Sequence, residues 1–193
     1  MVDNFDNEIL ETYRKLIPYS YKADFARFCI LYILGGWYFD IGLVCQAKVS
    51  LSEDINLLFF RDINIYSHTS WACASGLIFA KKQQPIIKKA IELIIKNVSD
   101  EYYGLTPLCP TGPSLFGRAI ASIGIDEKVL IGDFIELTPN FKKKNKAMVM
   151  PDGTIFALNK QALGGDLSSL GCQGTNNYND FWNNKNIYKK KIL

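Results

Sequence analysis

The sequence has a single histidine and no pair of cysteines spaced as Cys-x-x-Cys, so a structural zinc site is not expected. Charged residues make up only 21% of the chain and the formal net charge is +3, which does not indicate a nucleic-acid-binding protein. The longest nearly unbroken apolar run, 28–39, is interrupted by two glycines and falls short of the roughly 20 residues of a membrane-spanning helix. The first residues are acidic and polar, unlike a signal peptide. These absences predict a cytoplasmic protein, at most in peripheral contact with the inner face of a membrane.

The five cysteines are odd in number and widely spaced. Cys29, Cys45 and Cys73 lie inside apolar runs, which favours reduced, buried thiols. Two groups of lysines, at 142–146 and 189–191, are expected either to be solvated or to contact an anionic lipid head group or polyanionic acceptor.

Hydrophobic periodicity and turn signals predict alternating helices and strands. The predicted helices cover 9–17, 23–34, 85–98 and a stretch that opens at 111–113. The predicted strands cover 37–40, 57–60, 63–67, 71–80, 129–137, 147–150 and 154–158. Pro18 ends the first helix, Asp24 lies in the first turn of the second, and Pro151-Asp152-Gly153 closes a hairpin.

The interleaving of these elements predicts one α/β domain with a mixed sheet over residues 1–193. Its expected parts are a helical start (1–34), a sheet-forming core that carries the site (35–137), and a hairpin followed by a loop-rich C-terminal part (138–193).

Three ionic residues stand out around one predicted helix and strand. Asp24 and Arg27 are three residues apart on a helix, hence on one face. Asp40 ends the apolar strand that follows Gly35-Gly36, and a charge at the end of a buried strand is costly without a partner or ligand. An ordinary surface ion pair and a glycine helix cap are the simpler interpretations. We expect instead that the three side chains converge on one polar pocket, because ligand sites of open α/β sheets lie beyond the strand ends.

The pattern Ala23-Asp24-x-x-Arg27, then Gly35-Gly36-x-Tyr38-x-Asp40, resembles the core of glycosyltransferase family 32. That family includes yeast-type initiating mannosyltransferases and bacterial capsule and lipopolysaccharide sugar transferases, and large clostridial glucosylating toxins share its core. Thr111-Gly112-Pro113 is a second match, and the tail 176–188 is similar to the ends of bacterial capsular transferases. The resemblance covers roughly residues 20–120.

The resemblance implies a GT-A-like nucleotide-sugar transferase fold and transfer of a sugar, with retention, to a saccharide or lipid-linked saccharide acceptor in surface polysaccharide synthesis. Asp24 and Arg27 would contact the sugar or diphosphate of the donor, together with Gly36 and Tyr38. Asp40 matches the first acid of the family's D-x-D, and is the expected catalytic residue and ligand of Mn²⁺ or Mg²⁺. A hard divalent ion suits this chemistry because the departing nucleoside diphosphate gains negative charge.

Further residues are expected at the acceptor side or in a loop that closes over the donor. These are Thr111, Gly112, Pro113, Asn176, Asn177 and Trp182. Trp37, Tyr38 and Trp71 are either stacking surfaces for a sugar or base, or core residues. His68 and Gly164-Gly165-Asp166 are interpreted as structural.

Two departures from the family pattern leave alternatives open. Gly42 occupies the second acidic position of D-x-D, so the metal is held by Asp40 alone, by another carboxylate, or not at all. The chain also starts after the family's nucleotide-binding first strand, so we expect an N-terminally truncated sequence: a fragment, a split reading frame or a shortened relative. Both departures favour a non-catalytic sugar- or nucleotide-binding remnant of such an enzyme as the first alternative. A toxin-like protein glucosyltransferase is a second, separate alternative.

Overall fold

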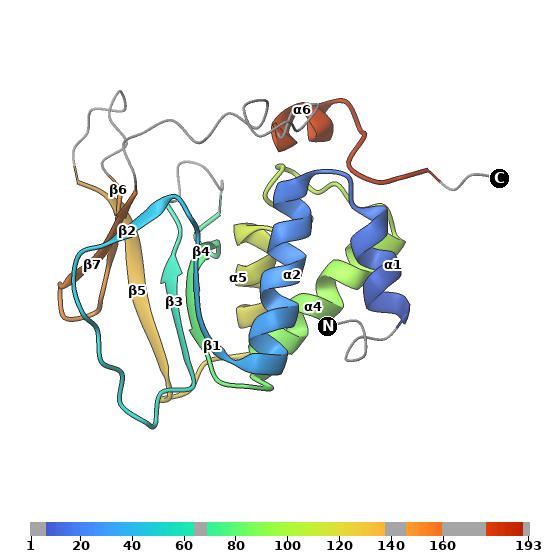
Figure 1. Cartoon of the computed structure of the whole chain (residues 1–193). Coiled ribbons are helices and arrows are strands. Elements are labelled where there is room, and N and C mark those ends of the chain that lie inside the picture. The colour runs from blue at the N-terminus through green and yellow to red at the C-terminus, as the bar shows by residue number, and fades with distance from the viewer. Residues whose placement is uncertain (1–6, 64–68, 138–145, 160–176, 191–193) are drawn as a thin grey trace.

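The computed structural model describes residues 7–63, 69–137, 146–159 and 177–190. A helical layer covers one face of a sheet, and a short helix, α6 (Tyr178–Asn183), lies at the end of the assembly where α2 begins (Figure 1). The helical layer consists of α1 (Asn7–Lys15), α2 (Tyr19–Leu34), α4 (Pro85–Ser99) and α5 (Pro113–Ile123). The strands are β1 (Gly36–Phe39), β2 (Leu43–Cys45), β3 (Leu57–Arg61), β4 (Cys73–Ala80), β5 (Val129–Glu136), β6 (Lys146–Val149) and β7 (Ile155–Asn159).

The seven described strands form one sheet in the order β1-β4-β3-β5-β6-β7-β2. Strands β3 and β5 are parallel and the other neighbours are antiparallel. The predicted α/β fold with a mixed sheet is therefore confirmed, and so is the hairpin of β6 and β7. Its extent as a single domain over 1–193 stays a prediction.

Helix α2 is the centre of the helical layer. Tyr21, Phe25 and Phe28 are almost fully buried on it, and the ring centroids of Phe28 and Phe116 lie 5.1 Å apart. The helix ends at Gly35, whose φ of +65° favours glycine and whose N–H donates to the Leu31 carbonyl. The glycine cap, one of the simpler interpretations of Gly35-Gly36, is therefore present, and the chain passes directly into β1.

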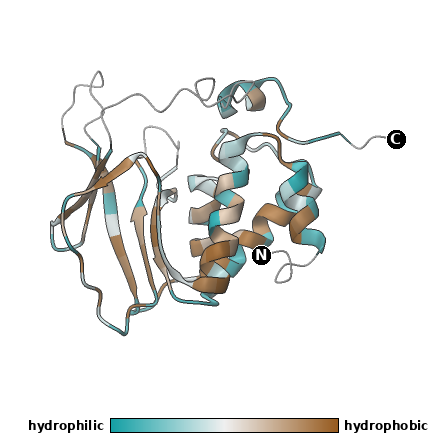
Figure 2. Ribbon diagram, in the orientation of Figure 1, coloured by the Kyte–Doolittle hydropathy of each residue, from teal (hydrophilic) through white to brown (hydrophobic). Residues whose placement is uncertain are grey.

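Strands β3 and β5 present alternate side chains to two apolar clusters. On β3, Leu57 and Phe59 belong to the cluster shared with the helices, whereas Leu58 and Phe60 belong to a second cluster with the β6–β7 hairpin. Hydrophobic residues accordingly run along the strands and the facing helices (Figure 2). The sheet is therefore covered on both faces, by helices on one and by its own hairpin on the other.

The sheet must curl. A flat seven-stranded sheet would place its outer strands about 29 Å apart. The outer strands β1 and β2 are joined by residues 40–42 alone, a link that spans at most about 15 Å. Accordingly, the ring of Phe156 on β7 lies 5.3 Å from Trp37 and 5.7 Å from Phe39, both on β1. The 40–42 link consequently lies at the mouth of a curled sheet.

Strand β4 contains a large bulge. Its pairing with β3 passes from Leu58↔Phe79 to Phe60↔Ala74, so β3 advances by two residues while β4 advances by five. The extra residues lie in the segment that contains Ser75 and Gly76. A bulge redirects side chains and ends the regular ladder locally, and this one lies next to Asp40, whose N–H donates to the Gly76 carbonyl.

Helix α5 approaches the start of β4 very closely. A Cβ atom on Gly117 would lie 1.6 Å from the carbonyl oxygen of Trp71, so a glycine is required for this packing. The close approach fixes the first turn of α5, at Gly112 and Pro113, beside the bulge of β4.

Several local predictions were wrong. Helix α2 begins at Tyr19, directly after Pro18, so Asp24 lies in its second turn and not in its first. Strand β2 and helix α6 were not predicted, because β2 has only three residues and α6 lies in an Asn-rich stretch. Cys45 is exposed because it lies on the short outer strand β2, whereas Cys29 and Cys73 are buried as expected.

Other predictions concern residues that lie partly or wholly outside the described ones. Ile63 lies in no strand, and the rest of the predicted strand 63–67 is not described. His68, the lysines of 142–144 and Gly164-Gly165-Asp166 likewise lie outside. Among the described helices, none combines the length and the apolar character needed to cross a bilayer.

Candidate active site

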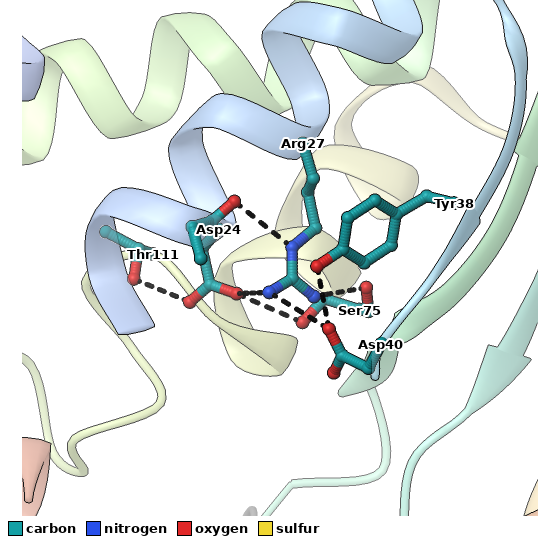
Figure 3. A network of polar contacts seen from close by, with 7 residues as sticks. Asp24, Arg27, Tyr38, Asp40, Ser75 and Thr111 are labelled. Carbon is teal, nitrogen blue, oxygen red and sulfur yellow. Dashed lines mark hydrogen bonds and ion pairs between the residues drawn. The ribbon is translucent and has the colours of Figure 1, made fainter. Parts of the chain in front are cut away.

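The three predicted ionic residues lie together. The guanidinium Nη2 of Arg27 is 3.1 Å from Oδ1 of Asp24 and 3.6 Å from Oδ1 of Asp40 (Figure 3). Asp24 and Arg27 come from successive turns of one face of α2, and Asp40 follows the last residue of β1. The expectation that they converge rests on local spacing alone, and the structure places them as expected.

Arg27 is the centre of this cluster. Its side chain is only 6% exposed, and it donates through Nε to the Ala23 carbonyl at 3.3 Å and through Nη1 to the Ser75 carbonyl. The guanidinium carbon lies 4.5 Å from the centroid of the Tyr38 ring. Because every one of its nitrogens has a partner, Arg27 holds α2, β1 and the β4 bulge in one arrangement.

Asp24 is buried, and protein donors surround its carboxylate. Thr111 donates to Oδ2 at 2.9 Å and Ser75 donates to Oδ1 at 3.3 Å. Burial raises the pKa of Asp24 to about 6, while Arg27 and the two hydroxyl donors lower it and the charge of Asp40 raises it. The Thr111 contact joins α2 to the start of α5, 87 residues away in the chain.

Asp40 is the accessible acid of the cluster, with a side chain that is 45% exposed. Its Oδ1 accepts a hydrogen bond of 2.7 Å from the hydroxyl of Tyr38, whose pKa is raised mainly by burial and lowered by Arg27. A Cβ atom on Gly76 would lie 2.7 Å from Oδ2 of Asp40. The carboxylate is therefore oriented by a tyrosine on one side and a glycine on the other.

Asp40 opens into a cleft of about 420 Å³. The cleft is lined by the link 40–42 and Leu43, by Asp62, by the β4 bulge from Ala74 to Gly76, and by Pro113, Phe134, Met148 and Asn159. A larger cavity of about 580 Å³ lies between α1, α4 and the C-terminal segment and includes no member of the ionic cluster. Chemistry, not size, therefore identifies the cleft at Asp40 as the candidate site.

Some residues near the site were not predicted. Asp62 follows the apolar strand β3 as Asp40 follows β1, so the same signal was present in the sequence. Asn159 ends β7, and Ser75 and Gly76 belong to the bulge, which no local pattern indicates. Burial raises the pKa of Tyr178 on α6, and the charges of Asp24 and Asp62 raise it further.

The residues expected at the acceptor side are distributed over three places. Thr111 binds Asp24, a Cβ on Gly112 would lie 3.6 Å from Oδ2 of Asp24, and Pro113 lines the cleft. Asn177 caps α6, accepting from the N–H of Asn179, and Trp182 donates its Nε1–H to the Tyr103 carbonyl at 2.8 Å. These last two contacts fix α6. Asn176 lies outside the described residues.

Two other expected site residues lie apart from the cluster. Gly36 begins β1 opposite Ala80, at the end of the strand remote from Asp40, and its φ of +101° makes the turn out of α2. Trp37 lies on the opposite side of β1 from Tyr38, against Phe79 and Phe156. Trp71, the third candidate stacking residue, is 65% exposed.

Few side chains of the described residues near Asp40 could bind a metal ion. Within the described part of the chain, no three His, Cys, Asp or Glu residues gather as a metal-binding group. Mg²⁺-type sites at substrate phosphates commonly use one or two carboxylates, with phosphate oxygens and water completing the shell. The half-exposed Asp40 fits an ion held in that way and does not fit one held by the protein alone.

Comparison with known proteins gives three findings. Residues 1–63 match the protein family described as a glycosyltransferase sugar-binding region containing a DXD motif. A protein of Acanthamoeba polyphaga mimivirus, described as an uncharacterized glycosyltransferase, is 34% identical over 96 residues, which are 50% of this chain and 36% of the viral protein. A solved structure, the PaToxG glycosyltransferase, is similar over 54% of this chain and 35% of its own, with 23% identity and a TM-score of 0.42.

These findings differ in weight. The matched region 1–63 contains Asp24, Arg27, Tyr38 and Asp40, so the ionic cluster lies in the part of the chain that resembles glycosyltransferases. The aligned part spans little more than a third of the viral relative. At a TM-score of 0.42 the structural likeness carries no argument on function.

The raised pKa of Asp24 predicts a pH-dependent stability. Because its folded pKa of about 6 lies above the ordinary 3.8, its contribution is fully present below about pH 4 and is lost as the pH rises through about 6. Relative to Asp24→Asn, the wild-type free energy of unfolding should fall by on the order of 3 kcal/mol over that range. Urea denaturation of both proteins at several pH values measures this difference. A difference that is constant with pH would contradict the burial of an ionisable Asp24.

Proposed function

We propose that this protein is a glycosyltransferase that moves a sugar from a nucleotide-sugar donor to a saccharide acceptor. One observation carries the proposal: Asp40, at the end of β1, is oriented by Tyr38 and the buried Arg27 and opens into a cleft. The match of residues 1–63 to a DXD-containing sugar-binding region supports it, because that region contains all three residues. We keep Asp40 as the catalytic residue, with Asp24, Arg27 and Tyr38 at the donor. Gly36, also predicted at the donor, is left out because it lies at the end of β1 remote from Asp40.

The buried contacts suggest a division of roles within the cluster. Asp24 and Arg27 are occupied by protein partners, so they hold the donor side of the cleft in shape. Asp40 keeps an accessible carboxylate that can accept a hydrogen bond from a sugar or ribose hydroxyl. Tyr38 donates to the same carboxylate and so restricts the directions in which Asp40 can accept.

The charge of the cluster favours a divalent cation as cofactor. Ionised Asp24 and Asp40 exceed Arg27 by one negative charge, which would repel a diphosphate. Mn²⁺ or Mg²⁺, when bound, would offset the charge of the diphosphate leaving group, and Asp40 is the residue that would hold it. Gly42 contributes no side chain, so the substrate oxygens and water would complete the shell.

The specific reaction, acceptor and location that we propose follow from the resemblance to glycosyltransferase family 32. We propose family-32-type transfer with retention on a GT-A-like fold, serving surface polysaccharide synthesis such as capsule or lipopolysaccharide. The acceptor would be a saccharide or a lipid-linked saccharide, reached by a cytoplasmic protein at the inner face of a membrane. The motif Asp24-x-x-Arg27 with Gly35-Gly36-x-Tyr38-x-Asp40 supports this assignment.

A non-catalytic sugar- or nucleotide-binding protein is the second candidate. Gly42 favours it, because the position of the second D-x-D acid carries no ligand. The two candidates differ in turnover: an enzyme releases nucleoside diphosphate from a nucleotide sugar, whereas a binding remnant does not.

Asp40→Asn is expected to reduce the release of nucleoside diphosphate by about 100-fold or more, because the substitution removes the charge that faces the reacting diphosphate or its ion. The assay incubates the purified chain with a panel of nucleotide sugars, with and without Mn²⁺. Asp54→Asn, an exposed aspartate before β3, is the matched control and should retain wild-type turnover. Binding of a nucleotide sugar without turnover by the wild type would favour the second candidate. Full activity of Asp40→Asn would refute the catalytic assignment.

Gly76→Ala should displace the Asp40 carboxylate, because the new Cβ would lie 2.7 Å from Oδ2. A misplacement of this kind is expected to lower kcat/KM by roughly 10- to 100-fold. The free energy of unfolding should change by less than about 1 kcal/mol, since the clashing atom is the end of a side chain. Combined with Asp40→Asn, the substitution should cost little more than Asp40→Asn alone. Independent, additive losses would show that Gly76 acts elsewhere.

A further inference from the structure

The cleft has a second polar wall, formed by residues outside the ionic cluster. Asp40 and the β4 bulge form one side. The other side has two polar residues, Asp62 after β3 and Asn159 at the end of β7. Phe134 of β5 and Met148 of β6 lie between them in the strand order. We infer that this second wall, from Asp62 to Asn159, binds the acceptor saccharide. The inference rests on the proposed function, because it assigns the acceptor to the cleft in which Asp40 faces the donor.

Asp62 is held firmly at the end of β3. Its N–H donates to the Ala72 carbonyl at 2.8 Å, and its Oδ1 accepts from the N–H of Ile63 at 2.9 Å. Burial raises the pKa of Asp62, and the positive charge of Lys146 lowers it. The carboxylate is thus a hydrogen-bond acceptor in a fixed position.

The remaining lining residues suit a sugar. Asn159 ends β7 opposite Leu43, and its side-chain amide can both donate and accept. Phe134 is half-buried on β5, with the Lys146 ammonium 5.8 Å from its ring centroid, and Met148 is buried beside it on β6. An apolar floor with a few fixed polar groups is typical of small-molecule sites. A pyranose presents an apolar C–H face and hydroxyls that donate and accept, which this wall can satisfy together.

Charge separates the two walls. On the Asp40 side, two carboxylates share one arginine, which suits a metal–diphosphate group. On the Asp62 side, the lining includes one carboxylate, and the Lys146 ammonium lies 5.8 Å from the centroid of the lining ring of Phe134, so the wall favours an uncharged, polyhydroxylated ligand over a diphosphate. The donor and the acceptor would then meet at the β4 bulge, beside Ser75 and Gly76.

The experiment compares acceptor and donor kinetics in Asp62→Asn and Asn159→Ala. A panel of p-nitrophenyl hexopyranosides serves as acceptor probe, with the donor identified from nucleoside diphosphate release. Each substitution should raise the acceptor KM by about tenfold or more and raise the donor KM much less, since each removes a hydrogen-bonding group that faces the acceptor alone. Donor consumption should shift from transfer toward hydrolysis. Asp54→Asn, at the other end of β3, is the matched control and should show wild-type values.

A second readout does not depend on turnover. Saturation-transfer NMR with the same glycosides should show contacts to the wild type that weaken in both variants, with thermal unfolding confirming that each is folded. Equal acceptor KM values and equal NMR contacts in wild type and variants would overturn the inference. A rise in the donor KM alone would overturn it too, because the wall would then belong to the donor. Absence of any donor turnover, with glycoside contacts still lost in the variants, would refute the proposed function and leave the saccharide wall standing.

Discussion

The arrangement of this protein's cleft depends on one buried guanidinium. Arg27 is almost wholly removed from water, which is costly unless each donor finds a partner. Its partners are Asp24, Asp40, the Ala23 and Ser75 carbonyls and the face of the Tyr38 ring, and they come from α2, β1 and β4. Moving any of these elements would leave a buried charge or polar group unpaired. The constraint therefore fixes where the accessible acid, Asp40, stands.

The fold supplies the surroundings that this constraint needs. A short turn at Gly35-Gly36 carries the chain from α2 to β1, so Arg27 and Asp40 meet although they belong to different layers. The bulge of β4 brings a backbone carbonyl to Arg27 and leaves room at Gly76 for the Asp40 carboxylate. The close packing of α5 on the Trp71 carbonyl places Thr111 against Asp24. Curling of the sheet then turns the strand ends into the walls of a cleft.

The sequence predicted what depends on local spacing. Asp24 and Arg27 share a helix face because they are three residues apart, and Asp40 ends an apolar strand, so their meeting follows from one helix, one turn and one strand. Helix α4 and the β6–β7 hairpin follow likewise from Pro85 and from Pro151-Asp152-Gly153. The start of α2 was predicted at residue 23 but lies at Tyr19. Pro18 interrupts the apolar periodicity of the first helix and also directly precedes α2, so it did not reveal where the second helix begins.

Features that depend on distant pairing could not be predicted. The β4 bulge exists only relative to β3, and the curl only relative to the order of all seven strands. Asp62 carried the same signal as Asp40, but its place in the same cleft depends on that curl. The contact of Thr111 with Asp24 joins residues far apart in the chain, and no periodicity indicates it. Sequence reasoning therefore found the ionic cluster of the site and missed the second wall, from Asp62 to Asn159.

The most direct measurement of the central claim is a double-mutant cycle between Arg27→Lys and Asp40→Asn, with kcat/KM for nucleoside diphosphate release as the readout. Lysine keeps the charge but lacks the planar fork of donors with which Arg27 contacts Asp24, Asp40 and the Ser75 carbonyl. If Arg27 acts by orienting Asp40, Arg27→Lys should lose most of the activity that Asp40→Asn loses, and the double variant should lose little more. Wild-type kcat/KM in Arg27→Lys, or two losses that simply add, would contradict the account.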